Sequence, residues 1–378
     1  ENRLLPTRTM TRISSNHDDD VVIRHARRLL AVRTDNVGDI VMLAPALRAL
    51  KQAAPDAHLT VMASPAGAAA APLVPWIDDV VVECVVWQDA TGELAFDPGR
   101  EMALVDRIRA ARYDAALLFT SFSQSPWPAA YACYLAGVPV RAGESKEFGG
   151  SLLTHEAPSL LDGAHQVDRN LHLIEALGLT GSARPAVVVP EAARDSADDL
   201  LVRAGVARGE PYVVVAPGAT ARARRYPRGR VAAVVDGLVA LGVRVVVVGR
   251  DGDDVGLPVD RQGVSSITGR TTVTELAAVI ERAGVVVCNN SGPLHLADAL
   301  GRPLVVTYSG TDLHSQWAPR NVPARLLDRP VPCSPCYGFD CPYDRACLDV
   351  PPSEVVAAAV ALFTTDDERK AVCANSGS

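Results

Sequence analysis

The sequence has few aromatic residues, 5% of its 378 positions, and its eight cysteines are too few for a disulfide scaffold in a chain of this length. It lacks an uninterrupted apolar run of the roughly 18–20 residues that a membrane-spanning helix needs. It also lacks a net positive charge: the net charge of -7 argues against a general nucleic-acid binder, because such a protein needs a basic surface. We therefore expect a cytoplasmic protein with no transmembrane segment and no nucleic-acid partner, and we leave open a peripheral place at the inner face of the membrane.

What the sequence does have is Ala, Val and Leu, which supply most of its 48% hydrophobic content. Short Val-rich runs alternate with helical patterns of apolar residues. Continuous apolar runs are typical of strands buried on both faces, and the alternation predicts parallel sheets with crossover helices. The expected strands are 29–32, 59–62, 80–86, 115–119, 138–141, 212–216, 243–248, 285–288 and 304–307. The expected helices are 39–53, 101–112, 127–136, 167–178, 228–241, 272–283 and 293–300.

This alternation lapses between residues 179 and 211, where Gly, Pro and polar residues are mixed. We therefore predict two domains, 25–185 and 186–350. Residues 1–24 are polar, lack the apolar core of a signal peptide and are expected to be a disordered tail. In doubly wound folds, ligands bind outside the carboxyl ends of the strands, so the loops that follow the strands are the candidate sites.

The first such loop carries Gly38-Asp39, within RTDNVGDIVMLAPALRALK. A strand-to-helix turn of this kind often binds phosphate with bare backbone N–H groups, but here it holds a carboxylate. An Asp at this position commonly caps its helix. It could instead act as a general base toward a hydroxyl in the cleft between the domains. The turn taken alone favours the cap.

Two loops of the second half carry charged residues after a buried strand. In APGATARARRYPRGR, Thr220 is followed by five arginines. Such a loop suits a polyanion, although a solvated basic loop or a nucleic-acid patch would explain the same run. In VVVVGRDGDD, Asp251 is placed to accept hydrogen bonds from a ribose or a base. The triplet that it begins also resembles a metal-binding Asp-x-Asp, or a plain turn.

A third loop, NNSGPLHLADALG, leads from a strand into a helix. Ser291 or Gly292 caps the helix, Pro293 suits its first position, and His295 lies in its first turn. Free N–H groups, a small hydroxyl and an imidazole make this turn a candidate anion site. A capped helix with an incidental histidine is the alternative, and the turn alone does not decide between them.

Several stretches together resemble glycosyltransferase family 9, the bacterial ADP-heptose:lipopolysaccharide heptosyltransferases. The four that carry the resemblance are RTDNVGDIVMLAPALRALK, APGATARARRYP, VVVVGRDGD and NNSGPLHLADALGRPLV. A late PCSPCYGFDCPYDRACL, followed by VPPSEVVAAAV, is also similar to the family's ending. The stretches occur in the family's order and span residues 28–362, nearly the whole chain.

The resemblance implies an α/β chain with the GT-B fold, in which two Rossmann-like, doubly wound domains face each other across a cleft. It also implies a C-terminal helix at 351–365 that packs back on the first domain, before a disordered tail at 366–378. The implied reaction is inverting and independent of metal or other cofactors. It moves a sugar, heptose from ADP-heptose, to a hydroxyl of a glycan or a glycosylated small molecule. A nucleotide-sugar epimerase and a non-catalytic nucleotide-binding protein are the alternatives.

Carried over residue by residue, the resemblance makes Asp39 the catalytic base, with Gly38 beside it on the acceptor side. The donor-binding residues that it implies are Thr220, Arg224, Asp251, Asn290, Ser291, Gly292 and His295. Two of these depart from the family pattern: Arg224 stands where Lys is usual, and Asn290 stands where Asp is common. Arg keeps the positive charge with a different geometry, whereas Asn removes a negative one.

Other candidates come from the residues themselves. Basic side chains in the first domain could contact a phosphorylated acceptor or be ordinary surface charges; they are Arg141, Lys146 and Arg169. Trp317 is a candidate wall of the donor site.

The cysteines fall into two groups. Cys333, Cys336, Cys341 and Cys347 form C-x2-C-x4-C-x5-C, whose later spacings do not repeat a CxxC knuckle. We interpret them as a structural loop, with zinc as the less favoured alternative. The cysteines in apolar segments are expected in the core; they are Cys84, Cys133 and Cys288.

Overall fold

A computed structural model describes residues 23–89, 92–253, 256 and 261–375, with side chains described as far as residue 363. The tail expected at 1–24 lies outside the described residues except for Ile23 and Arg24. Ile23 is fully buried in the first core, so the first domain begins slightly before residue 25. No helix in the described part of the chain is both long and apolar enough to span a membrane.

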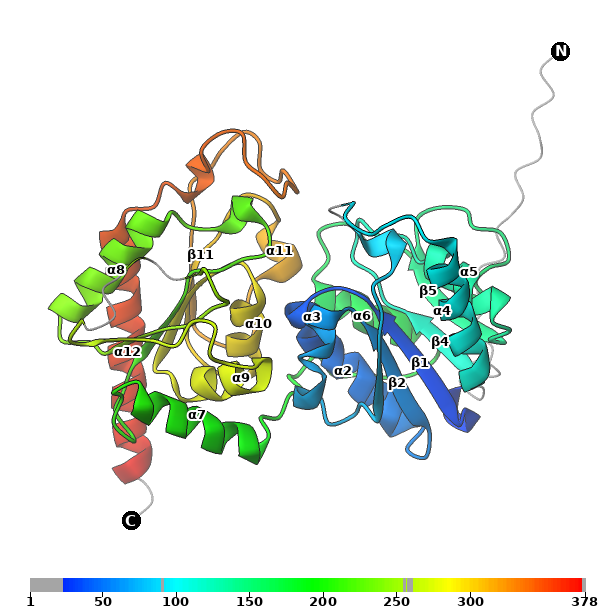
Figure 1. Cartoon of the computed structure of the whole chain (residues 1–378), viewed down its shortest axis with the longest axis horizontal. Coiled ribbons are helices and arrows are strands. Elements are labelled where there is room, and N and C mark those ends of the chain that lie inside the picture. The colour runs from blue at the N-terminus through cyan, green and yellow to red at the C-terminus, as the bar shows by residue number, and fades with distance from the viewer. Residues whose placement is uncertain (1–22, 90–91, 254–255, 257–260, 376–378) are drawn as a thin grey trace.

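Two six-stranded sheets form the protein (Figure 1). The strand order is β3-β2-β1-β4-β5-β6 in the first and β12-β11-β10-β7-β8-β9 in the second, and all the neighbours pair in parallel. Both are the doubly wound order, in which the winding reverses once, between β1 and β4 and between β7 and β10. The expected pair of Rossmann-like domains is confirmed.

The elements of the first domain alternate as the sequence predicts, with short additions. Its strands are β1 (Arg28–Arg33), β2 (His58–Ala63), β3 (Asp79–Val82), β4 (Ala115–Leu118), β5 (Val140–Ser145) and β6 (His155–Pro158). Its helices are α2 (Val37–Ala53), α3 (Pro65–Ala68), α4 (Pro98–Ala111), α5 (Trp127–Leu135) and α6 (Gln166–Ala176), with short 3₁₀ turns η1 (Ala71–Leu73) and η2 (Val86–Gln88).

The second domain repeats the pattern. Its strands are β7 (Val213–Ala216), β8 (Val245–Val247), β9 (Val264–Ser266), β10 (Val285–Asn289), β11 (Leu304–Thr307) and β12 (Ala324–Leu327). Its helices are α7 (Glu191–Arg203), α8 (Arg228–Ala240), α9 (Val273–Arg282), α10 (Gly292–Ala299), α11 (His314–Trp317) and α12 (Pro352–Asn375), with 3₁₀ turns η3 (Arg222–Arg224) and η4 (Ala346–Leu348).

Helices cover both faces of each sheet, and the two-residue period of the strands divides each domain into two cores. In β7, Val213 and Val215 belong to the core under α8 and α12, whereas Val214 and Ala216 belong to the core under α7, α9 and α10. The first domain is built alike, with α2 and α6 on one face and α4 and α5 on the other. Burial on both faces explains why the central strands are continuous apolar runs.

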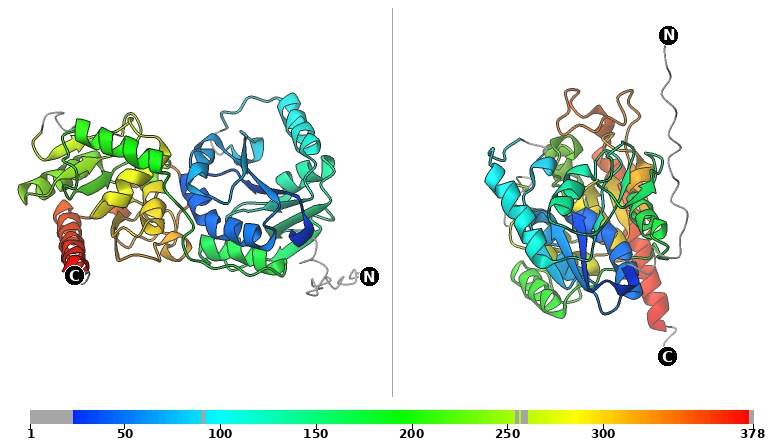
Figure 2. Two further views of the ribbon diagram at one scale, coloured as in Figure 1. Left: turned by 90° about the horizontal axis from the view of Figure 1, so that it is seen from below. Right: turned by 90° about the vertical axis from the view of Figure 1, so that its right-hand side faces the viewer.

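A C-terminal helix is present where one was expected, at 351–365, but the expectation that it packs on the first domain was wrong. Helix α12 packs on α8 and on β10 and β11 of the second domain, where Val355, Ala359 and Leu362 are buried. Figures 1 and 2 show it on the side of the second domain that faces away from the first. It also continues to Asn375, through most of the tail expected at 366–378. The three apolar side chains follow a helical spacing and cover sheet surface that α8 leaves open.

The two domains meet along a seam where α2 of the first packs on α10 of the second (Figure 1). Three polar contacts cross the same seam. The His165 ring lies 3.0 Å from the carbonyl oxygen of Ala318, and Arg320 is paired with Asp168 at 2.7 Å. The Gln316 amide also donates to the carbonyl of residue 162, at 2.9 Å. These contacts set the loops after the two sheets opposite each other.

Candidate active site between the domains

Gly38 of α2 and His295 of α10 approach each other closely across the seam. A Cβ atom at residue 38 would lie 2.5 Å from Cδ2 of His295, so a side chain there would collide with the imidazole. On its other side, His295 meets Trp317 edge-on, with ring centroids 6.3 Å apart. Burial lowers the pKa of His295 to about 4, although Asp39 acts in the opposite direction. The imidazole is therefore neutral at pH 7, next to the residue that precedes Asp39.

Asp39 is held by two donors. As the third residue of α2, it accepts a hydrogen bond from the backbone N–H of Asn36, at 3.0 Å, so it does cap the helix. Its other oxygen accepts from Nη2 of Arg33, at 2.6 Å. The side chain keeps 15% of its surface exposed. Capping and catalysis are therefore compatible, because the two contacts fix the carboxylate while part of it still faces solvent.

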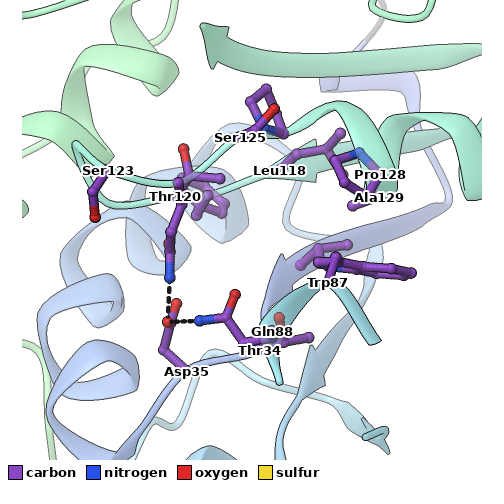
Figure 3. A pocket seen from close by; sticks show the side chains of 14 residues that line it. Thr34, Asp35, Trp87, Gln88, Leu118, Thr120, Ser123, Ser125, Pro128 and Ala129 are labelled. Carbon is purple, nitrogen blue, oxygen red and sulfur yellow. Dashed lines mark hydrogen bonds between the residues drawn. The ribbon is translucent and has the colours of Figure 1, made fainter. Parts of the chain in front are cut away.

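A second carboxylate, Asp35, shares the same arginine, and the sequence reasoning missed it. Nε of Arg33 lies 2.9 Å from Asp35, so one fully buried guanidinium pairs with both carboxylates. Gln88 and Gln124 donate to one oxygen of Asp35, at 2.5 and 2.6 Å (Figure 3). Burial raises the pKa of Asp35 to about 6, and the negative charge of Asp39 adds to this against the opposing effect of Arg33. The signal was available in RTDNVGD, where Asp35 follows a strand as Asp39 does.

On the facing domain, helix α10 begins at the carboxyl end of β10. Ser291 is its N-cap residue, and its hydroxyl donates to the carbonyl oxygen of Gly218, at 3.2 Å. This hydrogen bond ties the start of α10 to the turn that follows β7. A Cβ at Gly292 would come within 3.7 Å of Val37, so the free end of α10 points toward the start of α2. The structure thus brings Ser291, Gly292 and His295 together beside Gly38, as expected.

Arg224 and Asn290 are joined through Asp312. Arg224 donates to Thr311 at 3.1 Å and to Asp312 at 2.9 Å, and about a third of its side chain is exposed (34%). Asn290 donates to the other oxygen of Asp312 at 3.1 Å, and its own carbonyl accepts from the backbone N–H of Ser309 at 3.2 Å. Asn290 is buried and both ends of its amide are engaged. It therefore positions the carboxylate that holds Arg224.

Two further donor candidates lie at the rim. Thr220 is exposed in the loop between β7 and η3, and Asp251 is exposed in the turn after β8, where its side chain lies over Gly269. The neighbouring Asp253 packs instead over Gly218, in the turn that carries the candidate donor site. Sequence reasoning chose Asp251 from the same triplet, because spacing alone cannot tell which of two Asp residues in a turn points back at the sheet.

The expectation that Arg141 contacts an acceptor was wrong. Arg141 lies near the start of β5, at the end of the sheet away from the ligand-binding loops, and is buried. Its guanidinium donates to the carbonyl oxygens of Val138, Pro139 and Leu152. The other two cations do lie at the carboxyl ends of the strands, but each is paired with a carboxylate: Lys146 with Asp162 and Arg169 with Glu144.

The loop with four cysteines reaches across the seam. Its Tyr337 donates its backbone N–H to Thr311 at 2.8 Å, and its ring packs on Phe122 of the first domain with centroids 5.0 Å apart. Cys347 is buried, Cys341 is half-buried, and Cys333 and Cys336 are exposed. Across the described ranges, no group of three or more His, Cys, Asp or Glu side chains is arranged to hold a metal ion.

The three remaining cysteine predictions divide. Cys133 and Cys288 are buried, as expected. Cys84 is exposed, and that prediction was wrong. It follows β3, an edge strand whose residues are at most half-buried, so an apolar run there did not indicate a core position.

Comparison with known proteins gives a consistent result. The sequence profile of glycosyltransferase family 9 (heptosyltransferase) matches residues 102–346. Lipopolysaccharide heptosyltransferase 3 of Escherichia coli is 29% identical over 229 residues, which are 57% of this chain and 65% of that protein. Its counterpart in E. coli strain K12 is 25% identical over 303 residues, 75% of this chain and 82% of that protein. The solved structure of the E. coli ADP-heptose lps heptosyltransferase II has a TM-score of 0.70 at 22% identity, and the match covers 90% of this chain and 99% of that one.

Two doubly wound domains whose ligand-binding loops face each other define a class of fold, the GT-B fold. The family profile covers well over half of the chain, and the motifs fall in their expected places on the fold. The chain belongs to glycosyltransferase family 9 (heptosyltransferase). It is therefore a glycosyltransferase.

Proposed function

We propose that this enzyme transfers heptose from ADP-heptose, with inversion and without a metal ion, to a hydroxyl of a glycan or a glycosylated small molecule. One observation carries the proposal: the contact of Gly38 with His295 sets Asp39 beside the free start of α10. A base on one domain and an anion-binding helix terminus on the other are what an inverting displacement at a sugar carbon needs. The names of the relatives above support heptose and ADP as parts of the donor.

In this mechanism the second domain stabilises the leaving diphosphate. The free N–H groups at the start of α10 and the guanidinium of Arg224 supply positive potential where negative charge develops. Because His295 is neutral, it acts as an N–H hydrogen-bond donor and not as a cation. Thr220 contributes a hydroxyl at the rim. We assign to Asp253, rather than Asp251, the role of accepting hydrogen bonds from the ribose or base, because Asp253 packs over Gly218 in the turn after β7.

The first domain activates the acceptor. Asp39 accepts the proton of the acceptor hydroxyl while that oxygen bonds to the anomeric carbon, and the bond from this carbon to the diphosphate breaks. The proton ends on the Asp39 carboxyl group, and the electron pair leaves with ADP. Arg33 and the N–H of Asn36 hold the carboxylate in one orientation, so little reorganisation precedes the proton transfer.

The decisive experiment is Asp39→Asn. Loss of general-base catalysis should reduce acceptor-dependent ADP release about 10²–10⁴-fold. The dissociation constant for ADP should stay within a few-fold of the original, because its phosphates are bound by the other domain. Asp56→Asn is the matched control, since Asp56 is exposed just beyond the far end of α2. Unchanged turnover in Asp39→Asn, or a large loss of ADP binding, would refute the assignment of the base.

The donor and the absence of a metal are tested separately. Binding of a ligand raises the melting temperature by mass action, so ADP should stabilise the chain more than UDP or GDP at equal concentration. Turnover should survive prolonged treatment with EDTA. A preference for UDP, or a loss of turnover that Mg²⁺ or Mn²⁺ restores, would overturn these two parts of the proposal. The cytoplasmic location also belongs to the proposal, and cell fractionation tests it together with peripheral membrane contact.

A further inference from the structure

A pocket of about 200 Å³ opens at the point where the winding of the first sheet reverses, between the carboxyl ends of β1 and β4. Asp35 lines it, together with Gln88 and Gln124. The volume is below the roughly 300–1,000 Å³ of sites for drug-sized ligands, which suits a single sugar ring. Arg33 pairs with both Asp35 and Asp39, so the pocket lies beside the proposed base.

The walls of this pocket differ in polarity. Figure 3 shows Trp87, Leu118, Pro128 and Ala129 together on one flank, away from Asp35 and Ser123. A sugar ring has a matching division, with C–H groups on its faces and hydroxyls around its edge. An indole can cover such a face, while a carboxylate and carboxamides hydrogen-bond the hydroxyls.

The charge of the pocket disfavours anionic ligands. None of the described residues that line it is a lysine or an arginine, and its one ionisable side chain is the carboxylate of Asp35. The nearby Arg33 is buried and already paired with two carboxylates. An adjoining pocket of about 260 Å³ contains Lys146 and Arg169, but each of these also has its own carboxylate partner. An anionic ligand would lose its hydration and meet a like charge with no cation to compensate.

We propose that the Asp35 pocket binds the terminal sugar of the acceptor and selects an uncharged sugar over a sugar acid or a sugar phosphate. Trp87 covers one face of the ring, and Asp35 accepts hydrogen bonds from its hydroxyls. The proposal rests on the proposed function, because it concerns the acceptor of that same reaction. We attribute the selectivity to repulsion between Asp35 and an anionic sugar. Measurements of ligand binding can therefore test the proposal without a turnover assay.

The experiment measures the binding of small probes to the full chain by ligand-observed NMR, with no donor present. The neutral probes are methyl α-mannopyranoside and methyl α-glucopyranoside, and the anionic ones are mannose 6-phosphate and methyl glucuronide. We expect the neutral probes to bind at least about ten-fold more tightly at pH 7.5, the size of effect expected for an uncompensated like charge. Asp35→Asn should narrow this difference. Trp87→Ala should weaken the neutral probes about three- to ten-fold, and Trp87→Phe should largely preserve them.

Three outcomes would overturn the proposal: anionic probes that bind as tightly as neutral ones, neutral probes that do not bind, or a Trp87→Ala variant that binds them normally. A melting temperature close to the original, measured for each variant, shows that the fold is intact. Failure here is distinct from failure of the proposed function. If the enzyme releases ADP normally but prefers anionic probes, the proposed reaction stands and the assignment of the Asp35 pocket to a neutral sugar is wrong.

Discussion

Gly38 and His295 meet across the domain seam with no space for a side chain at residue 38, since a Cβ there would lie 2.5 Å from the imidazole. The backbone of Gly38 is not in the left-handed region, so alanine fits the helix locally. The glycine is therefore required by the approach of the other domain and not by its own conformation. This relationship makes the position of Asp39 depend on the closure of the two domains.

The first prediction follows from that contact. Gly38→Ala should displace His295 and shift α2 relative to α10. Neither the α2 backbone nor the packed imidazole ring can move away at low cost. We expect acceptor-dependent turnover to fall about 10²-fold, the loss that a misplacement of about 1 Å can cause. Steady-state kinetics of purified protein provides the measurement.

The double variant Gly38→Ala/His295→Ala is the control, because it removes the atoms that the new methyl group would meet. The loss of activation free energy in the double variant should be smaller than the sum of the losses in the two single variants. Such non-additivity is the signature of directly coupled positions. If the two single losses simply add, residues 38 and 295 are not energetically coupled.

The second prediction concerns Arg33, whose fully buried guanidinium neutralises Asp35 and Asp39. Replacement by methionine leaves two carboxylates without their partner, and we expect a loss of about 3–5 kcal/mol in the free energy of unfolding. Arg33→Lys should be intermediate, since an ammonium keeps the charge but cannot present a planar fork to two carboxylates. Urea unfolding measures both. A methionine variant as stable as the original chain would mean that the ion pairs are not a net source of stability.

The third prediction is a pH dependence that belongs to Asp35, whose pKa is about 6 in the folded chain. As the pH falls below 6, this carboxylate takes up a proton and can no longer accept hydrogen bonds as an anion. We expect kcat/KM for the acceptor to fall on this acidic side, and Asp35→Asn to remove that limb of the profile. A limb near pH 6 that persists in Asp35→Asn would assign the titration to another group.

The same shift affects stability with a definite sign. Between pH 3.8 and about 6, the folded chain holds the Asp35 proton more firmly than the unfolded chain does. The contribution of this residue to stability therefore decreases as the pH rises through that window. A burial cost of this kind is tolerated at sites where a charge serves binding.

The sequence predicted the central strands and missed three of the four edge strands. The expected runs at 29–32, 115–119, 285–288 and 304–307 are central strands that both neighbours and helices bury. Strands β6, β9 and β12 were not predicted. Each pairs on one side only, and HEAP, VSS and ARLL carry little of the Val-rich pattern that double burial imposes.

The residues of the candidate site could be predicted where they belong to a local sequence motif. They could not be predicted where only tertiary contacts bring them together. Gly38, Asp39, Ser291, Gly292 and His295 come from local strand-to-helix turns, and the fold places them together. The glutamines that hold Asp35 come from elsewhere in the chain. No spacing rule relates Gln88 or Gln124 to residue 35, because the three meet only once β1, β4 and η2 lie side by side.

The last prediction concerns His165, which joins the domains in one tautomer. Its Nδ1 accepts the backbone N–H of Val167 at 3.2 Å, so the proton must be on Nε2, which donates to Ala318 at 3.0 Å. Protonation of the ring would place an N–H at Nδ1, directly facing the backbone N–H of Val167. Burial accordingly lowers the pKa of His165 to about 4, with the charge of Arg320 acting in the same direction.

The folded chain therefore resists a proton that the unfolded chain binds below pH 6.5. The stability due to neutral His165 is fully present above that pH and is lost as the pH falls toward 4. The loss should amount to roughly 1–2 kcal/mol between pH 6.5 and 5. His165→Asn keeps an N-cap for α6 but cannot titrate, so unfolding free energies of this variant should fall less steeply over that range. Parallel curves for the variant and the original chain would assign the pH dependence elsewhere, with His295 as the next residue to replace.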